Sequence, residues 1–207
     1  MYTVPMALVD YIPVFLFAVA GVILMRDLYN KMSKGAYALF CAGTIDVFLA
    51  GFLKALYKLL YAAGVCDFSA LNTLFFPLQA IGFMLAGIGL VCLITRPQGK
   101  ERIYSVAAPA AFSGTMIFVV LMVLGLLGID VSLSAVAKKM NKKIAIVMFV
   151  LSFIFCLAMG YLSSRDFSQS SMHWVAEGVN VFGQALFFIG TLILHKNGLA
   201  DFQLAQD

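Results

Sequence analysis

The chain has 207 residues, of which 63% are hydrophobic and only 12% are charged, and its formal net charge is +4. A soluble domain is roughly 45–50% apolar, so this composition excludes an ordinary water-soluble fold. It indicates an integral membrane protein, and we expect it in the plasma (inner) membrane. The apolar runs are continuous rather than alternating, which argues against a transmembrane β-barrel.

The chain contains six apolar runs of the length that a membrane-spanning helix needs, about 20 residues. The first run has no basic residue before it, unlike a cleaved signal peptide, so we expect it to remain as a helix. Polar residues and glycines separate the runs, as is typical of turns. The sequence predicts an all-α, polytopic helix bundle that forms a single transmembrane domain over 1–207, with spans near 8–25, 36–62, 71–94, 105–129, 144–163 and 173–195.

The basic residues of the connections set the expected orientation, because cytoplasmic loops usually hold the excess of Lys and Arg. With six spans, the connections 26–35, 95–104 and 164–172 share one side and contain seven basic residues. This favours both termini outside. The four lysines of 130–143 fall on the opposite side in this scheme and oppose it.

Two basic tetrapeptides suggest an internal repeat. The sequence KMSK occupies 31–34 and KMNK occupies 139–142, each before a long apolar run. A second similarity relates the third and sixth predicted spans at an offset of 101, where Gly82 falls on Gly183, Gly89 on Gly190 and Gln79 on Asn180.

A repeated unit of three spans has a consequence for topology. The second unit would enter the membrane from the opposite side, so the halves 8–94 and 105–195 would form a 3+3 inverted repeat. KMSK and KMNK would then lie on opposite faces of the membrane. Inverted repeats are common in transporters, with the binding site near the midplane between halves. The alternative is coincidence, because apolar helices align with one another easily.

Four polar residues of the last span share one helical stripe. His173, Glu177, Asn180 and Gln184 are spaced by four, three and four residues, which places them on one face of an α-helix. Charged groups are costly in lipid, so this stripe should face the protein interior or a wet cavity. It would serve either as interhelical hydrogen bonding that holds the bundle together or as part of a solute pathway.

The second span carries Asp46, Lys54 and Lys58. Asp46 is the deepest carboxylate, and no aspartate can reach water from that depth, which favours a functional role with Lys54 or His173 as its partner. Lys54 could also attract an anion. Lys54 and Lys58 equally suit interface positions, from which long side chains reach the headgroups.

Three further features of the first and third spans bear on a pathway or on packing. Asp10 opens the first span, where it suits either an interface residue or part of a gate. Gln79 follows Pro77, and proline removes a backbone hydrogen bond, so we expect a kink there that could line a site. Gly82 and Ala86 form a small-xxx-small pair for a close helix contact, within the bundle or in a homodimer.

No cofactor or metal is predicted. The two histidines, His173 and His195, lie at opposite ends of one span, and the four cysteines show no metal-ligand spacing. No phosphate-binding glycine loop or Ser-His-Asp set is present. The basic loops suit anionic lipid headgroups rather than nucleic acid.

These observations favour a small transporter or channel that moves a solute or ion between two three-helix halves, with a homodimer expected from the small size. One alternative is a membrane-embedded enzyme that acts on lipid through His173 and Glu177. Another is a sensory or scaffold protein, which would be a dry bundle without a cavity. The predicted pathway residues are Asp46, Lys54, Gln79, His173, Glu177, Asn180 and Gln184.

Overall fold

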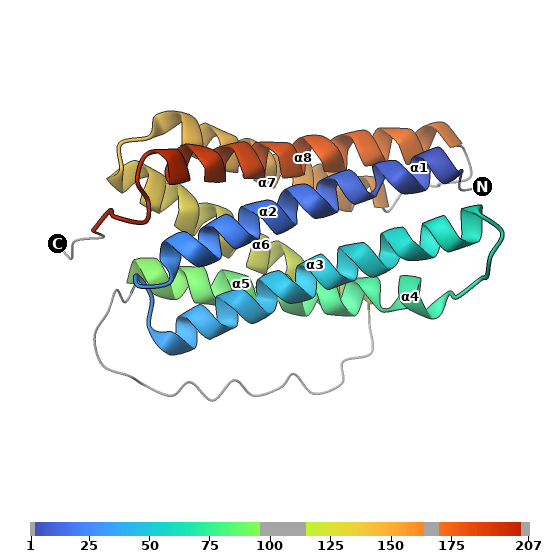
Figure 1. Cartoon of the computed structure of the whole chain (residues 1–207), viewed down its shortest axis with the longest axis horizontal. Helices are drawn as coiled ribbons and strands as arrows, with labels where there is room; N and C mark the ends of the chain where they lie inside the picture. Colours follow the sequence, from blue (N-terminus) through green and yellow to red (C-terminus); the bar gives the residue numbers. More distant parts are fainter. Residues whose placement is uncertain (1–2, 96–114, 164–169, 204–207) are drawn as a thin grey trace.

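A computed structural model describes residues 3–95, 115–163 and 170–203. All regular structure in these ranges is helical (Figure 1), and six helical segments are long and apolar enough to cross a membrane, which confirms the predicted all-α bundle. The first and third segments each begin with a short separate helix. The elements are α1 Val4–Val9, α2 Tyr11–Leu28, α3 Lys34–Ala62, α4 Ala70–Thr73, α5 Phe75–Thr95, α6 Thr115–Lys139, α7 Lys143–Ser163 and α8 Ser170–Lys196.

The fourth span differs from its prediction. The described helix α6 runs to Lys139, so the predicted end at 129 and the predicted connection 130–143 are wrong, whereas 105–114 lie outside the described residues. Asp130 and Ser132 are typical of a loop, yet both are buried inside the bundle. The turn that follows is short because Asn141 adopts a left-handed conformation with φ 57°, which asparagine tolerates better than most residues.

Proline explains where the first span is divided. Pro13 has no N–H to donate to the carbonyl of Val9, one turn earlier, so the helix is interrupted there, and Asp10 lies at the junction of α1 and α2. In the third span the break falls at Leu74, and Pro77 lies in the first turn of α5, where proline is tolerated.

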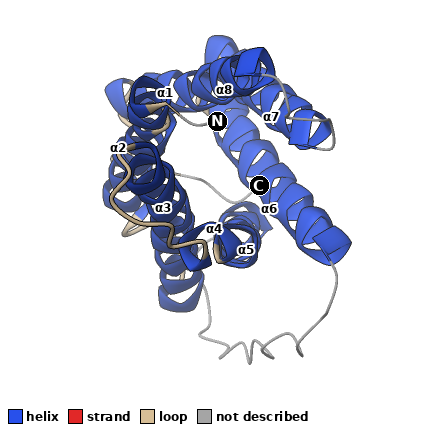
Figure 2. Ribbon diagram, turned by 90° about the vertical axis from the view of Figure 1, so that its right-hand side faces the viewer, coloured by secondary structure: helices blue, strands red, loops and turns tan. Residues whose placement is uncertain are grey.

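The six long helices pack in a ring. Each contacts the next along the chain, in the order α2, α3, α5, α6, α7 and α8, and α8 returns to contact α2. Figure 2 shows this order around the bundle. The ring brings the first and last helices of the chain together.

Two of the six contacts in the ring are between parallel helices. Along α5 and α6, Phe83 lies against Gly125 and Gly87 lies against Gly128. The residue numbers of the two helices therefore increase in the same direction. Along α2 and α8, the pairs Phe17–Phe187 and Asp27–His195 show the same direction. Because α5 and α6 are parallel, α6 starts from the same end of the bundle as α2.

The two sets of three helices run in the same order and the same direction. Gly82 of α5 packs on Val47 of α3, and Gly183 of α8 packs on Phe155 of α7. About two turns further along, Gly89 packs on Ala36 and Phe40, and Gly190 packs on the ring of Phe149. The contacted residues Val47 and Phe155 are 108 positions apart, and Phe40 and Phe149 are 109 apart, so the two sets of contacts agree to within one residue, with α2, α3 and α5 corresponding to α6, α7 and α8.

The expected inverted topology is wrong for this structure. KMSK (31–34) and KMNK (139–142) lie at the same end of the bundle, because the end of α2 and the turn between α6 and α7 are both on the left in Figure 1. The expectation that both termini share one side is also wrong, since the start of α1 and the end of α8 lie at opposite ends of the bundle. Both predictions failed because they assumed that α5 and α6 are antiparallel.

This end of the bundle, here called the lysine-rich end, collects most of the positive charge. Lys31 donates a hydrogen bond to the carbonyl of Phe202 at 2.5 Å, which ties the segment after α8 to the turn after α2, and partial burial lowers the pKa of Lys31. The four lysines of the α6–α7 turn lie on this side, not opposite it. Of the ten Lys and Arg residues in the described ranges, eight belong to it: Arg26, Lys31, Lys34, Lys138, Lys139, Lys142, Lys143 and Lys196.

The apolar core fills the lysine-rich half of the ring. All six long helices contribute to it, and its side chains are almost completely buried. The half of the bundle that contains α1 and α4 is packed differently and holds the cavities described below. The core includes Leu24, Leu28, Met32, Phe40, Leu90, Leu93, Leu133, Val136, Met140, Phe149, Leu194 and Leu199.

The parallel contact between α5 and α6 predicts the effect of adding a methyl group to Gly125. A Cβ there would collide with the backbone of Phe83 and Met84, so we expect Gly125→Ala to destabilise the protein by about 1–3 kcal/mol. At Gly35, near the start of α3, a Cβ meets nothing within 4 Å, and Gly35→Ala should be neutral or stabilising. Thermal unfolding of the purified variants in detergent measures both, and equal stability of the two variants would contradict the close contact.

Candidate functional site

Two adjoining cavities lie inside the ring, in the half opposite the lysine-rich end. Their volumes are about 80 Å³ and 110 Å³. Helices from both three-helix units contribute to the walls, so the cavities lie between the repeated halves. The residues that line both cavities are Lys54, Phe75, Gln79, Met159, Asn180 and Gln184.

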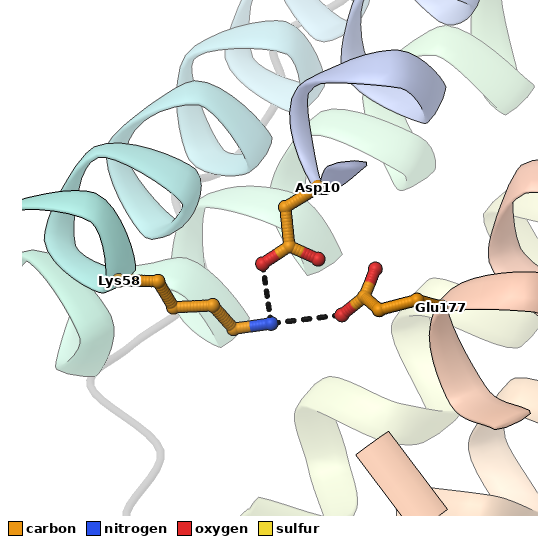
Figure 3. A network of polar contacts seen from close by, with 3 residues as sticks. All are labelled: Asp10, Lys58 and Glu177. Atoms are coloured by element: carbon orange, nitrogen blue, oxygen red, sulfur yellow. Dashed lines mark hydrogen bonds and ion pairs between the residues drawn. The ribbon is translucent and has the colours of Figure 1, made fainter. Parts of the chain in front are cut away.

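A buried ion triad forms one wall of the smaller cavity. The Nζ of Lys58 lies 2.5 Å from Oδ2 of Asp10 and 2.8 Å from Oε1 of Glu177 (Figure 3). Lys58 is 6% exposed, and the two carboxylates are 7% exposed. The three side chains come from α3, the α1–α2 junction and α8, so the triad joins α3 to both helices of the α2–α8 contact.

Lys54 is the second cation of the site, one turn before Lys58 on α3. Its Nζ lies over the ring of Phe75, 3.8 Å from the centroid, and it lines both cavities. Among the described residues no carboxylate forms an ion pair with it. The positive charge of Lys54 is therefore turned towards the cavities without an anionic partner.

The predicted stripe of α8 is divided by the structure. Glu177, Asn180 and Gln184 line the smaller cavity, and the latter two also line the larger one. The Oε1 atom of Gln184 is buried without a hydrogen-bond partner among the described residues. His173 does not belong to the cavity walls found in the described part of the chain.

Asp46 is not brought together with the other predicted residues. It lies on α3 beside the exposed Ile45 and Leu49 and lines none of the cavities within the described ranges. Eight residues of an α-helix turn through about 800°, which leaves Asp46 roughly 80° away from Lys54 around the helix. Val47 and Phe48, the next two residues along α3, line the smaller cavity.

A third, small cavity of about 10 Å³ lies deeper in the ring. Asp130, Ser152, Cys156 and Gln184 supply its polar groups, and Oδ1 of Asp130 is buried without a hydrogen-bond partner among the described residues. Its volume is close to the space that one water molecule needs. Gln184 connects it to the two larger cavities, since it lines all three.

Aromatic side chains surround this deeper cavity and separate it from the core of the lysine-rich half. The ring of Phe17 packs against Phe83 and Phe187 at centroid distances of 6.0 Å and 5.9 Å. Phe187 in turn contacts Phe149 of the core at 5.9 Å. The polar lining that continues from the two larger cavities into the third therefore ends at a packed layer of aromatic side chains.

Sequence reasoning left Asp10 as either an interface residue or part of a gate, gave Lys58 an interface role, and did not select Asp130 as a site residue. The helical spacing could have placed Lys58 at the cavity, because Lys54 and Lys58 are one turn apart and share a helix face with Val47. Asp10 stands three residues before Pro13, which marks a helix break. Neither pattern shows that both side chains point to Glu177, since this depends on the contact between α2 and α8.

The chemistry of the site is that of polar and ionic binding. It offers two ammonium groups, two carboxylates and three amides within an apolar bundle. In the described part of the chain, no three His, Cys, Asp or Glu side chains gather in a way that could hold a metal ion. The arrangement can bind a small charged or polar molecule.

Comparison with protein-family models, with curated proteins and with solved structures finds no match to this chain.

The ion triad predicts a large loss of stability when its cation is removed. Lys58→Met leaves the buried carboxylates of Asp10 and Glu177 without a counter-charge, and breaking a buried pair costs about 3–5 kcal/mol. Thermal unfolding in detergent should show this loss. Adding Asp10→Asn and Glu177→Gln removes both uncompensated charges and should recover most of the stability. A triple variant no more stable than Lys58→Met would contradict the triad.

Proposed function

We propose that this protein is a membrane transporter that moves a small charged or polar solute along the axis of the helix ring. The observation that carries the proposal is the pair of cavities between the two three-helix units, lined by charged and amide side chains. Charged groups inside a membrane bundle are costly, and they commonly mark substrate or ion pathways.

The unequal packing of the two ends supports a carrier rather than an open channel. The polar cavities occupy the half of the ring near α1 and α4, and the apolar core and aromatic layer fill the lysine-rich half. A carrier exposes its site to one side at a time. In several transporter families, parallel repeats related by an axis along the membrane normal rock against each other to exchange the open side.

The two alternatives have less support. A lipid-directed enzyme would use Glu177 to orient His173, but Oε1 of Glu177 accepts a hydrogen bond from Lys58 instead. A scaffold protein predicts a dry bundle, whereas this ring contains polar cavities. Neither alternative explains why Lys54 and three amides face the same space.

The charge distribution leads us to propose an orientation in the plasma (inner) membrane. The positive-inside rule places the lysine-rich end in the cytoplasm, where its lysines meet anionic lipid headgroups. The end of α8 is then cytoplasmic and the start of α1 is outside. We expect a fluorescent protein fused to the C-terminus to fold and fluoresce, and an N-terminal epitope to be reached by antibody on intact spheroplasts. The reverse result would contradict this orientation.

A transport assay tests the proposed function. Proteoliposomes that contain the protein should take up at least one member of a panel of radiolabelled organic anions, cations and amino acids faster than empty liposomes. Gln184→Leu should slow that uptake by about tenfold, the effect of losing one polar contact worth roughly 1.4 kcal/mol, because Gln184 lines all three cavities.

Asp46→Asn is the matched control, since it also replaces a polar side chain of a membrane-spanning helix but lies outside the cavities. Its uptake should equal that of the wild type. Transport in the ring would be refuted if the wild type moved no solute of the panel, or if both variants were affected equally.

A further inference from the structure

We propose that the cavities bind a small organic anion, a monocarboxylate with a short apolar tail, whose carboxylate contacts Lys54. This inference deepens the proposed transport function and rests on it for the meaning of the bound anion as a substrate. The binding itself is a separate property that can be measured without transport.

The charges of the site favour an anion over a cation. Lys58 already contacts both carboxylates, Asp10 and Glu177, so a cationic ligand would have to displace the Lys58 ammonium from them. Lys54 has the face of Phe75 beside its ammonium and forms no ion pair with a carboxylate in the described part of the chain. A cation–π contact contributes about 0.5–1 kcal/mol at an exposed site and about 2 kcal/mol when it is desolvated, and a carboxylate at Lys54 would add a hydrogen bond to a charged group, worth roughly 1.5–3 kcal/mol. A carboxylate therefore gains a direct partner at Lys54 without breaking an existing ion pair.

Amide side chains complete the polar part of the proposed site. Gln79 of α5 and Asn180 and Gln184 of α8 line the same two cavities as Lys54. Each amide can donate two hydrogen bonds to carboxylate oxygens. Gln184 would contact a carboxylate through its NH2 group, because the amide oxygen and the carboxylate oxygens all accept hydrogen bonds.

The larger cavity supplies the apolar part. Beyond Lys54 and the amides, its walls are mostly aromatic and aliphatic side chains of α5, α6 and α7. At about 110 Å³ it is somewhat smaller than the 150 Å³ apolar cavity that holds benzene in another protein. A tail of a few carbon atoms therefore fits. The apolar lining includes Phe76, Phe83, Met122, Leu126 and Phe155.

Calorimetric titration of the purified protein in detergent tests this assignment with one probe and four ligands that each change one of its chemical features. The probe is 4-methylpentanoate, which carries both the carboxylate and a branched apolar tail. It should bind about tenfold or more tightly than 4-methylpentanamide, which lacks the charge, and than acetate, which lacks the tail. It should also bind more tightly than 3-methylbutylamine, a cation, and than leucine, which adds an ammonium group.

Variants assign the charge to its residue. Lys54→Met should weaken binding of 4-methylpentanoate about tenfold or more, the loss expected of one charge-assisted hydrogen bond. Lys54→Arg should restore most of the affinity, because it keeps the cation over Phe75. Asp46→Asn on the same helix should leave the affinity unchanged. Thermal unfolding without ligand checks that each variant is folded.

Several results would overturn the assignment: no binding of 4-methylpentanoate to the wild type, tighter binding of the amine or of leucine, or equal binding to Lys54→Met. Failure of the transport function is a different result. If 4-methylpentanoate binds at Lys54 but no solute crosses proteoliposomes, the anion site stands and the transporter does not. If a cation is transported but no carboxylate binds, the transporter stands and the anion site does not.

Discussion

The contact of Lys58 with Asp10 and Glu177 holds α2, α3 and α8 together beside the cavities, and the site depends on this part of the ring. It joins the beginning and the end of the chain through α3, at the cavity end of the α2–α8 contact. At the lysine-rich end, the pair of Asp27 and His195 at 2.8 Å joins the same two helices. With both ends of this contact held by polar pairs, the ring encloses its cavities instead of opening between its first and last helices.

The parallel order of the helices follows from the places where backbones approach closely. Glycines at equivalent positions of α5 and α8 allow each helix to pack tightly on α3 and α7, respectively, and Gly125 allows α6 to lie directly against α5. Small residues at such contacts are a general means of helix association in membranes. The two sets of three helices, α2–α3–α5 and α6–α7–α8, therefore run in one direction, and the polar cavities lie where the two sets face each other.

Sequence reasoning identified the helices well, because runs of about 20 apolar residues leave little ambiguity. It ended the fourth span ten residues too early, at 129 instead of Lys139, since buried Asp130 and Ser132 have the composition of a loop. It also found the shared face of Glu177, Asn180 and Gln184, because residues on one helix have a fixed spacing. It could not decide how helices are arranged relative to one another, so Asp46 was favoured for its depth although it points away from the cavities. For the same reason Lys58 was assigned to the interface.

The two sets of three helices have similar arrangements but different side chains at the cavities, and this difference explains how the site would orient a solute. At the offsets of the repeat, Glu177 corresponds to Phe76, Gln184 to Phe83 and Lys54 to Leu162. Charged and amide groups line the cavities mainly from α3 and α8, whereas Phe76, Phe83 and Leu162 stand at three of the equivalent positions; Gln79 of α5 differs, because it corresponds to the amide Asn180. The cavities therefore have a mostly polar wall on α3 and α8 and a mostly apolar wall on α6 and α7. A molecule with a charged group at one end is held in a single orientation by such a cavity, whereas an ion without an apolar part gains nothing from the second wall. This asymmetry between the walls favours an amphipathic anion over a simple ion as the proposed ligand.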